Sequence, residues 1–256
     1  IRIPPLVTGT ARPTRQTPGL KITAEAESKL QSAILHRDRH IIAIDKAAGL
    51  AVQGGSGIKN HLDAMLDSLR FDAEERPRLV HRLDKDTSGV LLLARTAKSA
   101  RFLTEAFRTK ETEKVYWAAV HGVPRPNRGE ITGFLRKERV HGGDKVVMAP
   151  EGQSSHTTYR TISIAAQRAA WLELRPHTGR THQLRVHCAA IGTPVLGDGK
   201  YGGAAAFLDT DAIAKQVHLH ARSVTFPHPG GGTRTISAPL PPHMVATWKF
   251  LGFEEN

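Results

Sequence analysis

The segment 79–95, LVHRLDKDTSGVLLLAR, constrains the fold most strongly because a polar cluster in it runs directly into an apolar stretch. The apolar part, residues 90–94, is short, rich in branched side chains and preceded by Gly89, a pattern that predicts a buried β-strand. Loop residues fixed against a rigid strand are frequent positions for catalytic groups. Asp84, in the loop before this strand, is therefore the candidate nucleophile.

An attacking carboxylate has to be ionised, and this requirement limits where Asp84 can lie. Burial raises the pKa of a carboxyl group, whereas an arginine within a few Å lowers it, so Asp84 needs a cation beside it. Arg82 is the arginine in its own motif. The alternative interpretation is that Asp84 only caps Thr87, Ser88 or a helix end.

Composition narrows the class of protein. Lysine and arginine outnumber aspartate and glutamate by 36 to 24, and the formal net charge of +12 points to a polyanion, nucleic acid rather than membrane. The single cysteine, Cys188, excludes an intrachain disulfide or a Cys-x-x-Cys site and favours a reducing compartment, the cytoplasm. No apolar run approaches the ~18 residues of a membrane helix, and residues 1–5 do not resemble a signal peptide.

Periodicity predicts both helices and strands. The expected strands are residues 41–44, 90–94, 114–120, 156–164 and 171–174, and residues 136–145 form a basic loop or hairpin. The expected helices are residues 60–69, capped by Asn60, residues 98–109, and a third that Thr181 caps, with Leu184, Cys188 and Ile191 on one face and Gly192 after its end.

The sequence has three evenly spaced histidines that could suggest a metal site: His177, His182 and His187. Their spacing of five residues places successive side chains about 140° apart on a helix and on opposite faces of a strand. They therefore do not converge as in a His-Glu-x-x-His site, and we expect no metal.

Two glycine-containing segments resemble other enzyme motifs. Residues 54–57 lack the second glycine of a Gly-x-Ser-x-Gly elbow because position 58 is isoleucine, which disfavours a serine hydrolase. Residues 197–202 match Gly-x-Gly-x-x-Gly, but Pro194 interrupts the segment before them and no suitably placed acidic residue follows. We expect a glycine turn and no nucleotide cofactor.

Several long motifs in a fixed order resemble the RluA family of RNA pseudouridine synthases. The first is His-Arg-Leu-Asp-x-x-Thr-Ser-Gly-x-Leu-Leu-x-Ala around Asp84, and the others are residues 34–50, 114–122, 175–187 and 219–241. The resemblance thus covers nearly the whole chain from residue 34 to 241. One departure is Ala47, where the family usually has proline, and it affects a turn rather than the chemistry.

The resemblance implies an α+β fold with a mixed, largely antiparallel central sheet, flanking helices and an RNA-binding cleft. It further implies that residues 34–256 form the catalytic domain. Residues 1–33 would be the end of a missing S4-type RNA-binding domain followed by a basic linker arm, residues 8–20. No metal or cofactor is implied.

The resemblance also assigns roles to five residues. Asp84 begins the reaction, Tyr116 works against the target base, Arg180 pairs with Asp84, Leu184 forms an apolar wall, and Arg82 fills the space left by a flipped base. The implied activity is isomerisation of uridine to pseudouridine in RNA, most specifically large-subunit ribosomal RNA, by a cytoplasmic monomer. The alternatives are a non-catalytic RNA-binding or ribosome-assembly protein on the same fold and a metal-dependent nuclease.

Overall fold

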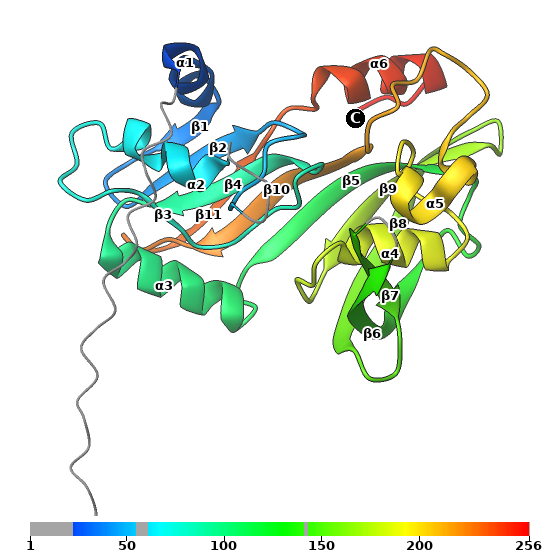
Figure 1. The fold of residues 1–256 in the computed structure, drawn as a ribbon, viewed down its shortest axis with the longest axis horizontal. Coiled ribbons are helices and arrows are strands. Elements are labelled where there is room, and N and C mark those ends of the chain that lie inside the picture. The colour runs from blue at the N-terminus through cyan, green and yellow to red at the C-terminus, as the bar shows by residue number, and fades with distance from the viewer. Residues whose placement is uncertain (1–22, 55–60, 141–142, 256) are drawn as a thin grey trace, which may run out of the picture.

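The computed structural model describes residues 23–54, 61–140 and 143–255, and its strands form one mixed sheet flanked by helices (Figure 1). The strand order is β1-β2-β4-β10-β5-β9-β8-β6-β7, with β3 added to β4 and β11 to β10. Neighbouring strands are antiparallel except for β4 and β10. The sheet is therefore mixed and largely antiparallel, as predicted.

The strands are β1 (Ile34–Arg37), β2 (Ile41–Lys46), β3 (Arg78–Leu79), β4 (Ser88–Ala94), β5 (Glu113–His121), β6 (Arg128–Val140), β7 (Gly143–Met148), β8 (Gln153–Ala165), β9 (Ala169–Pro176), β10 (Leu219–Pro227) and β11 (Thr233–Ser237). The helices are α1 (Ala24–Ser32), α2 (Leu62–Met65), η1 (Leu66–Leu69), α3 (Ala97–Arg108), α4 (Gln183–Ala190), α5 (Gly199–Gly202), η2 (Gly203–Ala206) and α6 (Pro242–Leu251). No helix in this described part of the chain is long and apolar enough to cross a membrane.

Strands β2 and β4 form the centre of one half of the sheet, and both of their faces are covered. Alternate residues point to opposite faces, so Leu91 and Leu93 pack with α1, α2 and η1 while Leu92 packs with α3. Every residue of β4 is buried. A strand covered on both faces has an uninterrupted apolar sequence, which explains the pattern in residues 90–94.

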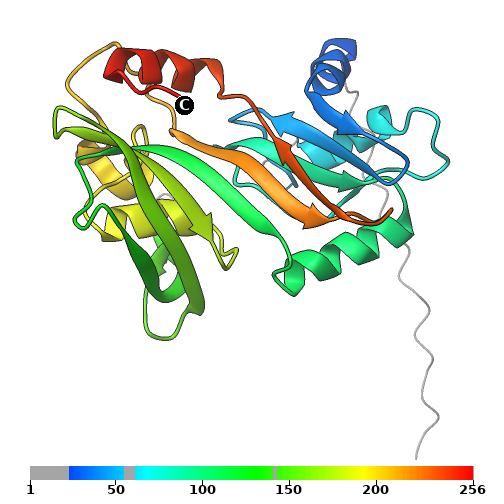
Figure 2. The same ribbon diagram turned by 180° about the vertical axis from the view of Figure 1, so that it is seen from behind.

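Strands β5 and β9 form the centre of the other half of the sheet, and side chains cover both of their faces as well. Ala118 and Leu172 pack beneath α4, whereas Trp171 faces the opposite way and packs against Trp248 of α6. Figure 2 shows this half from behind, with α4 and α5 on the far side of the sheet.

The two halves join where β4 runs parallel to β10, and the junction depends on a glycine. Gly89 pairs with Ala221 and has a φ of +108°. A Cβ built on Gly89 would lie 2.2 Å from the backbone oxygen of Ala221. Only glycine permits this approach, so the glycine of the Thr-Ser-Gly motif brings the Asp84 loop to the junction.

The predicted strands at 41–44, 90–94, 114–120, 156–164 and 171–174 are confirmed, as is the helix at 98–109. Within the predicted helix at 60–69, Leu62–Met65 form a short α-helix and Leu66–Leu69 continue it as a 3₁₀-helix. Strands β6 and β7 pair antiparallel, which agrees with a hairpin in the region of residues 136–145. The linker arm at 8–20 and the cap at Asn60 lie outside the described residues. Helix α2 is capped by His61, whose Nδ1 accepts a hydrogen bond from the Ala64 nitrogen at 3.2 Å. Helix α1 precedes the boundary predicted at 34, yet its Leu30 is buried in the same core as Leu91, so the folded domain includes it.

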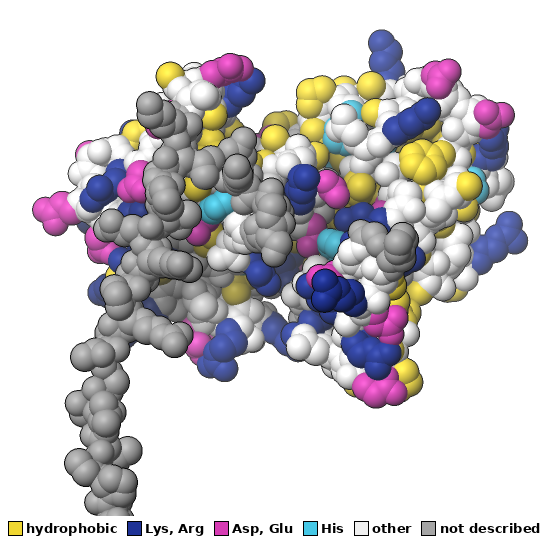
Figure 3. All heavy atoms as spheres, in the orientation of Figure 1, with side chains coloured by type: hydrophobic (Ala, Val, Ile, Leu, Met, Phe, Trp, Pro, Cys, Tyr) yellow, Lys and Arg dark blue, Asp and Glu magenta, His cyan; other side chains and the backbone are white. Residues whose placement is uncertain are grey.

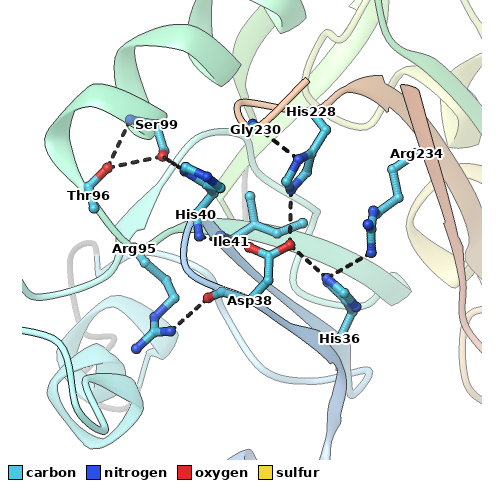
Figure 4. A network of polar contacts seen from close by, with 10 residues as sticks. All are labelled: His36, Asp38, His40, Ile41, Arg95, Thr96, Ser99, His228, Gly230 and Arg234. Carbon is cyan, nitrogen blue, oxygen red and sulfur yellow. Dashed lines mark hydrogen bonds and ion pairs between the residues drawn. The ribbon is translucent and has the colours of Figure 1, made fainter. Parts of the chain in front are cut away.

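A carboxylate ties the β1–β2 turn to the β10–β11 turn (Figure 4). Asp38 Oδ1 accepts hydrogen bonds from the backbone nitrogens of His40 (2.7 Å) and Ile41 (2.9 Å). Its Oδ2 lies 2.9 Å from His36 Nε2 and 3.0 Å from His228 Nε2. Burial alone would raise the pKa of Asp38, but these hydrogen bonds and the His228 charge hold it well below its usual range.

Replacing Asp38 by asparagine is expected to lower the free energy of unfolding by about 2 kcal/mol at pH 7, because hydrogen bonds to a charged acceptor are lost. A carboxyl group with a depressed folded-state pKa stabilises above its unfolded pKa of about 3.9 and loses this effect as pH falls towards the folded value. The difference between Asp38→Asn and the native protein should therefore shrink below about pH 4, as measured by urea unfolding across pH.

The matched control is Asp67→Asn, which removes an exposed carboxylate paired with Arg76. An exposed pair contributes less than about 1 kcal/mol. Equal losses for the two variants, or a loss for Asp38→Asn that does not change with pH, would contradict the role assigned to Asp38.

Candidate active site

A cavity of about 760 Å³ lies where the two halves of the sheet meet. The Asp84 loop, the end of α3, the start of β5, the loop between β9 and α4, and Leu219 of β10 all contribute to its lining. In Figure 3 this face is hollowed between the halves, and Lys and Arg side chains lie around the hollow. The structure thus brings together all five residues assigned from the sequence: Arg82, Asp84, Tyr116, Arg180 and Leu184.

The loop that carries Asp84 is fixed by its backbone. The Thr87 nitrogen donates to the Asp84 oxygen (3.1 Å), which closes a turn, and the Gly49 nitrogen donates to the Lys85 oxygen (2.9 Å). The Asp84 side chain itself is only partly buried and lines the cavity. A rigid backbone therefore presents a carboxylate that a substrate can reach.

Lys46 is the internal support of this loop. Its side chain is almost fully buried, and its Nζ donates to the backbone oxygens of Ala47 (2.9 Å), Leu50 (2.9 Å) and Lys85 (3.1 Å). Burial lowers the pKa of Lys46 to about 8, although nearby carboxylates, Asp84 among them, act in the opposite direction. All three protons of the ammonium group are used to hold backbone, so Lys46 positions the loop.

Two histidines fix the ends of the Asp84 loop. His81 Nε2 accepts from the Leu92 nitrogen (2.9 Å), and its ring stacks on Phe107 at 4.4 Å. Burial and then the charge of Lys114 lower the pKa of His81 to about 3, so His81 is neutral. His220 Nε2 donates to a backbone oxygen, which leaves its Nδ1 to accept from Ser88 Oγ at 2.9 Å. Neither ring is free to transfer protons.

Tyr116 lies on β5, next to the Asp84 loop. Burial raises the pKa of its phenol, and the negative charge of Asp84 raises it further. Tyr116 is therefore a neutral phenol at neutral pH, and it can relay a proton or stack on a base without acting as a free phenolate.

A second buried cation beside the Asp84 loop is Arg185, which the sequence motifs did not single out. It forms a bidentate pair with Asp198, with Nε to Oδ2 at 2.7 Å and Nη2 to Oδ1 at 2.6 Å, and both side chains are almost fully buried. Its Nη1 also lies 3.7 Å from Asp86. Burial alone would lower the pKa of Arg185, but Asp198, Asp84 and Asp86 raise it. Arg185 is thus a buried positive charge whose direct partner is Asp198 and whose field reaches the Asp84 loop.

Arg180 lines the cavity but does not pair with Asp84 in this structure. Its side chain is exposed, and its Nε donates to the Ser154 oxygen at 3.1 Å. The predicted Asp84–Arg180 contact is therefore not formed here, because the hydrogen bond to Ser154 directs the guanidinium group elsewhere.

The predicted cap at Thr181 is wrong. Helix α4 begins at Gln183, and the residue before it, His182, has a left-handed φ of +53° and no capping side chain. The side-chain amide of Gln183 holds the loop before the helix instead. Its Oε1 accepts hydrogen bonds from the Arg180 nitrogen (3.0 Å) and from Thr178 Oγ1 (2.7 Å). Hydrogen bonds to the side-chain oxygen of the buried Gln183, rather than a cap at Thr181, therefore fix this loop.

Leu184 and Arg82 occupy contrasting places. Leu184 belongs to α4 and is buried in the core that this helix covers, and it also lines the cavity, which agrees with an apolar wall. Arg82 is exposed at the cavity, with its Nη1 3.3 Å from Gln53 Oε1. Its predicted role as a prop for the vacated base stack stays a prediction.

The three histidines separate in the structure. His177 is exposed at the cavity, His182 Nδ1 bonds to Tyr201 Oη at 2.6 Å, and His187 is buried between Ser155 and Thr157. Among the residues that the structure describes, no group of three or more His, Cys, Asp or Glu side chains is arranged to hold a metal ion. The segment 197–202 contains the short helix α5, capped by Asp198.

Comparison with known proteins identifies the family. The family model described as RNA pseudouridylate synthase matches residues 40–190, more than half of the chain. The chain belongs to this family of isomerases. The resemblance read from its motifs is thereby confirmed, and so is the predicted enzyme class.

Two curated relatives are similar along much of the chain. RNA pseudouridine synthase 4, mitochondrial, of Arabidopsis thaliana is 44% identical over 217 residues, 74% of this chain and 46% of that protein. Ribosomal large subunit pseudouridine synthase C of Pasteurella multocida is 38% identical over 230 residues, 88% of this chain and 68% of that protein. The chain thus spans about half the length of the first and two thirds of the second.

Solved structures show the same fold. Human RNA Pseudouridylate Synthase Domain Containing 4 superposes with a TM-score of 0.74 at 28% identity, covering 90% of this chain and 96% of that one. Human RNA Pseudouridylate Synthase Domain Containing 1 gives 0.67 at 26% identity, covering 82% and 83%. The predicted pseudouridine synthase fold is confirmed.

Arg185→Met is expected to destabilise the protein by about 3–5 kcal/mol, because it leaves Asp198 buried without its cation. The control Arg180→Met removes an exposed side chain, so its effect should stay within about 0.5 kcal/mol. Guanidinium unfolding of both variants measures the difference. The double variant Arg185→Met/Asp198→Leu should recover much of the loss, and equal stability of the two single variants would show that the Arg185–Asp198 pair is not a structural support.

Proposed function

We propose that this protein isomerises uridine in RNA to pseudouridine and that Asp84 starts the reaction. The observation that carries the proposal is the position of Asp84: a partly exposed carboxylate on a rigid loop that lines the same cavity as Tyr116, Arg180 and Leu184. The family of the chain supports the reaction type.

The cavity fits a nucleotide that has left the base stack. Its volume, about 760 Å³, lies within the roughly 300–1,000 Å³ of sites that enclose small molecules. Chemistry at the glycosidic bond requires the target base to be flipped out, at a cost of a few kcal/mol. Arg82 fills the vacated space in this proposal, which its position at the cavity and its lack of a carboxylate partner among the described residues support.

The reaction conserves all atoms of the nucleotide. The bond from N1 to C1′ breaks, the uracil turns, C5 bonds to C1′, and the C5 proton is lost as N1 gains one. Attack of Asp84 on the sugar, its attack on the base and its removal of a sugar proton each begin at a carboxylate in this place. Tyr116, held as a neutral phenol, relays the C5 proton, and Leu184 with Leu219 excludes water.

We further propose large-subunit ribosomal RNA as the substrate. The names of the relatives from Pasteurella multocida and Vibrio cholerae support this assignment, since both are ribosomal large subunit pseudouridine synthases C. The net charge of +12 suits a polyanion of that size. The alternative, a non-catalytic RNA-binding protein on the same fold, differs from this proposal in that it forms no pseudouridine.

We also propose that the protein acts as a monomer in the cytoplasm.

Asp84→Asn preserves size and removes the charge, so pseudouridine formation is expected to fall to background. Affinity for RNA should stay within about tenfold, roughly 1.4 kcal/mol, because phosphate contacts dominate binding. The measurement is pseudouridine formed on transcribed large-subunit ribosomal RNA, with affinity determined in parallel.

The control is Asp211→Asn, which removes an exposed carboxylate outside the cavity. Turnover by purified Asp84→Asn would overturn the assignment of Asp84, and no turnover by the native chain on any ribosomal RNA would favour the non-catalytic alternative. Mapping pseudouridines in cells with and without the gene then identifies the target uridine.

A further inference from the structure

One side of the cavity carries two lysines that the described structure leaves without a carboxylate partner. Lys110 follows α3 and Lys114 lies in β5, and both line the cavity beside His177. Burial, His156 and the charges of the two lysines lower the pKa of His177, and its Nε2 lies 3.2 Å from Thr158 Oγ1. The two like charges repel, and an anion bound beside both lysines relieves that repulsion.

Lys114 is the more buried of the two lysines. It precedes Tyr116 by two residues, so both side chains leave β5 on the same face. Within the described residues, no hydrogen bond and no ion pair involves its ammonium group, and burial, followed by Lys110, lowers its pKa. A partly buried ammonium group without a partner is costly, which contrasts with Lys46, whose three protons all have acceptors.

Lys110 is held in a backbone conformation that favours glycine. It follows Thr109, the C-cap residue of α3, and has a φ of +63°. Glycine is the usual residue at this position after a helix, and a strained residue at a cavity points to a role for its side chain.

The carboxylates nearest to these lysines in the sequence have other partners. Glu105 pairs with Arg108, Glu111 accepts from Thr109 Oγ1, and Glu113 pairs with Arg175. None of them lies within ion-pair distance of Lys110 or Lys114 in the described structure. The two lysines therefore remain available to an anion that enters the cavity.

We propose that Lys110 and Lys114 form a phosphate subsite that holds the RNA backbone beside the target uridine. Two residues of a β-strand span about 7 Å, so Lys114 lies at about the length of one nucleotide from Tyr116 along β5. A phosphate bound there fixes the sugar of the flipped nucleotide relative to Asp84. This assignment rests on the proposed function only in naming the nucleotide at Asp84 as the target.

The test measures binding rather than turnover. Each variant is made in the Asp84→Asn protein, so that the RNA is not converted, and a 20-nucleotide oligouridylate is titrated between about 0.1 and 1 M salt, a range of one decade. Loss of one phosphate contact makes the slope of log affinity against log salt less steep by about 0.7 on a single strand. Relative to the parent protein, the affinity of the variant at 0.1 M salt is then about fivefold lower than at 1 M salt. Lys114→Gln and Lys110→Gly should each show this loss, and the double variant about twice the change in slope.

Two controls separate binding from folding and from general charge. Lys110→Gly suits the left-handed backbone, so its melting temperature should equal or exceed that of the parent, and a loss of affinity then cannot come from unfolding. Lys98→Gln removes one charge from the exposed start of the same helix and should leave the slope unchanged.

The outcomes distinguish the subsite from the activity. Slopes for Lys114→Gln and Lys110→Gly equal to the parent, or an equal change for Lys98→Gln, would overturn the subsite even if the native chain makes pseudouridine. A loss confined to the two cavity lysines would support it even if no pseudouridine is formed.

Discussion

The close backbone contact between Gly89 and Ala221 is the constraint on which the site depends. It belongs to the two-residue pairing that makes β4 and β10 parallel neighbours, and β10 in turn pairs with β5, so this junction joins the half that carries Asp84 to the half that carries Tyr116. The positive φ of Gly89 also ends the Asp84 loop at the first residues of the strand. A side chain at this position would separate the two halves, and the cavity between them would lose its shape.

The polar groups around the cavity fall into two classes. Lys46, His81, Gln183 and Arg185 are buried or nearly so and have their hydrogen bonds satisfied by backbone or by a carboxylate. Such groups stabilise a single arrangement, because any movement would leave a buried polar atom unpaired. Arg82, Lys110, Lys114 and Arg180 line the cavity without a carboxylate partner in the described chain. The first class holds the site in place, and the second is left to meet the RNA.

The elements predicted correctly from the sequence are those whose structure depends on the periodicity of neighbouring side chains. The strand at residues 90–94 and the helix at 98–109 follow from side-chain periodicity, and the motif order placed Asp84, Tyr116 and Leu184 at one cavity. The cap at Thr181 failed because Gln183, reaching across to β8, satisfies the loop instead. Arg185 was missed for a similar reason: its importance comes from Asp198, thirteen residues later, and nothing in its neighbourhood distinguishes it from the other arginines.

The electrostatics of the site also order the steps of the proposed reaction. While Asp84 is ionised, its charge adds to burial in raising the pKa of Tyr116, so the phenol keeps its proton. Each route open to Asp84 neutralises that charge, either through a covalent bond to the nucleotide or through uptake of a proton. On the routes through the sugar, bonding of C5 to C1′ returns Asp84 to a carboxylate before the C5 proton leaves. Its charge then again adds to burial in raising the pKa of Tyr116, so the phenol relays the C5 proton to a further acceptor without losing its own proton permanently.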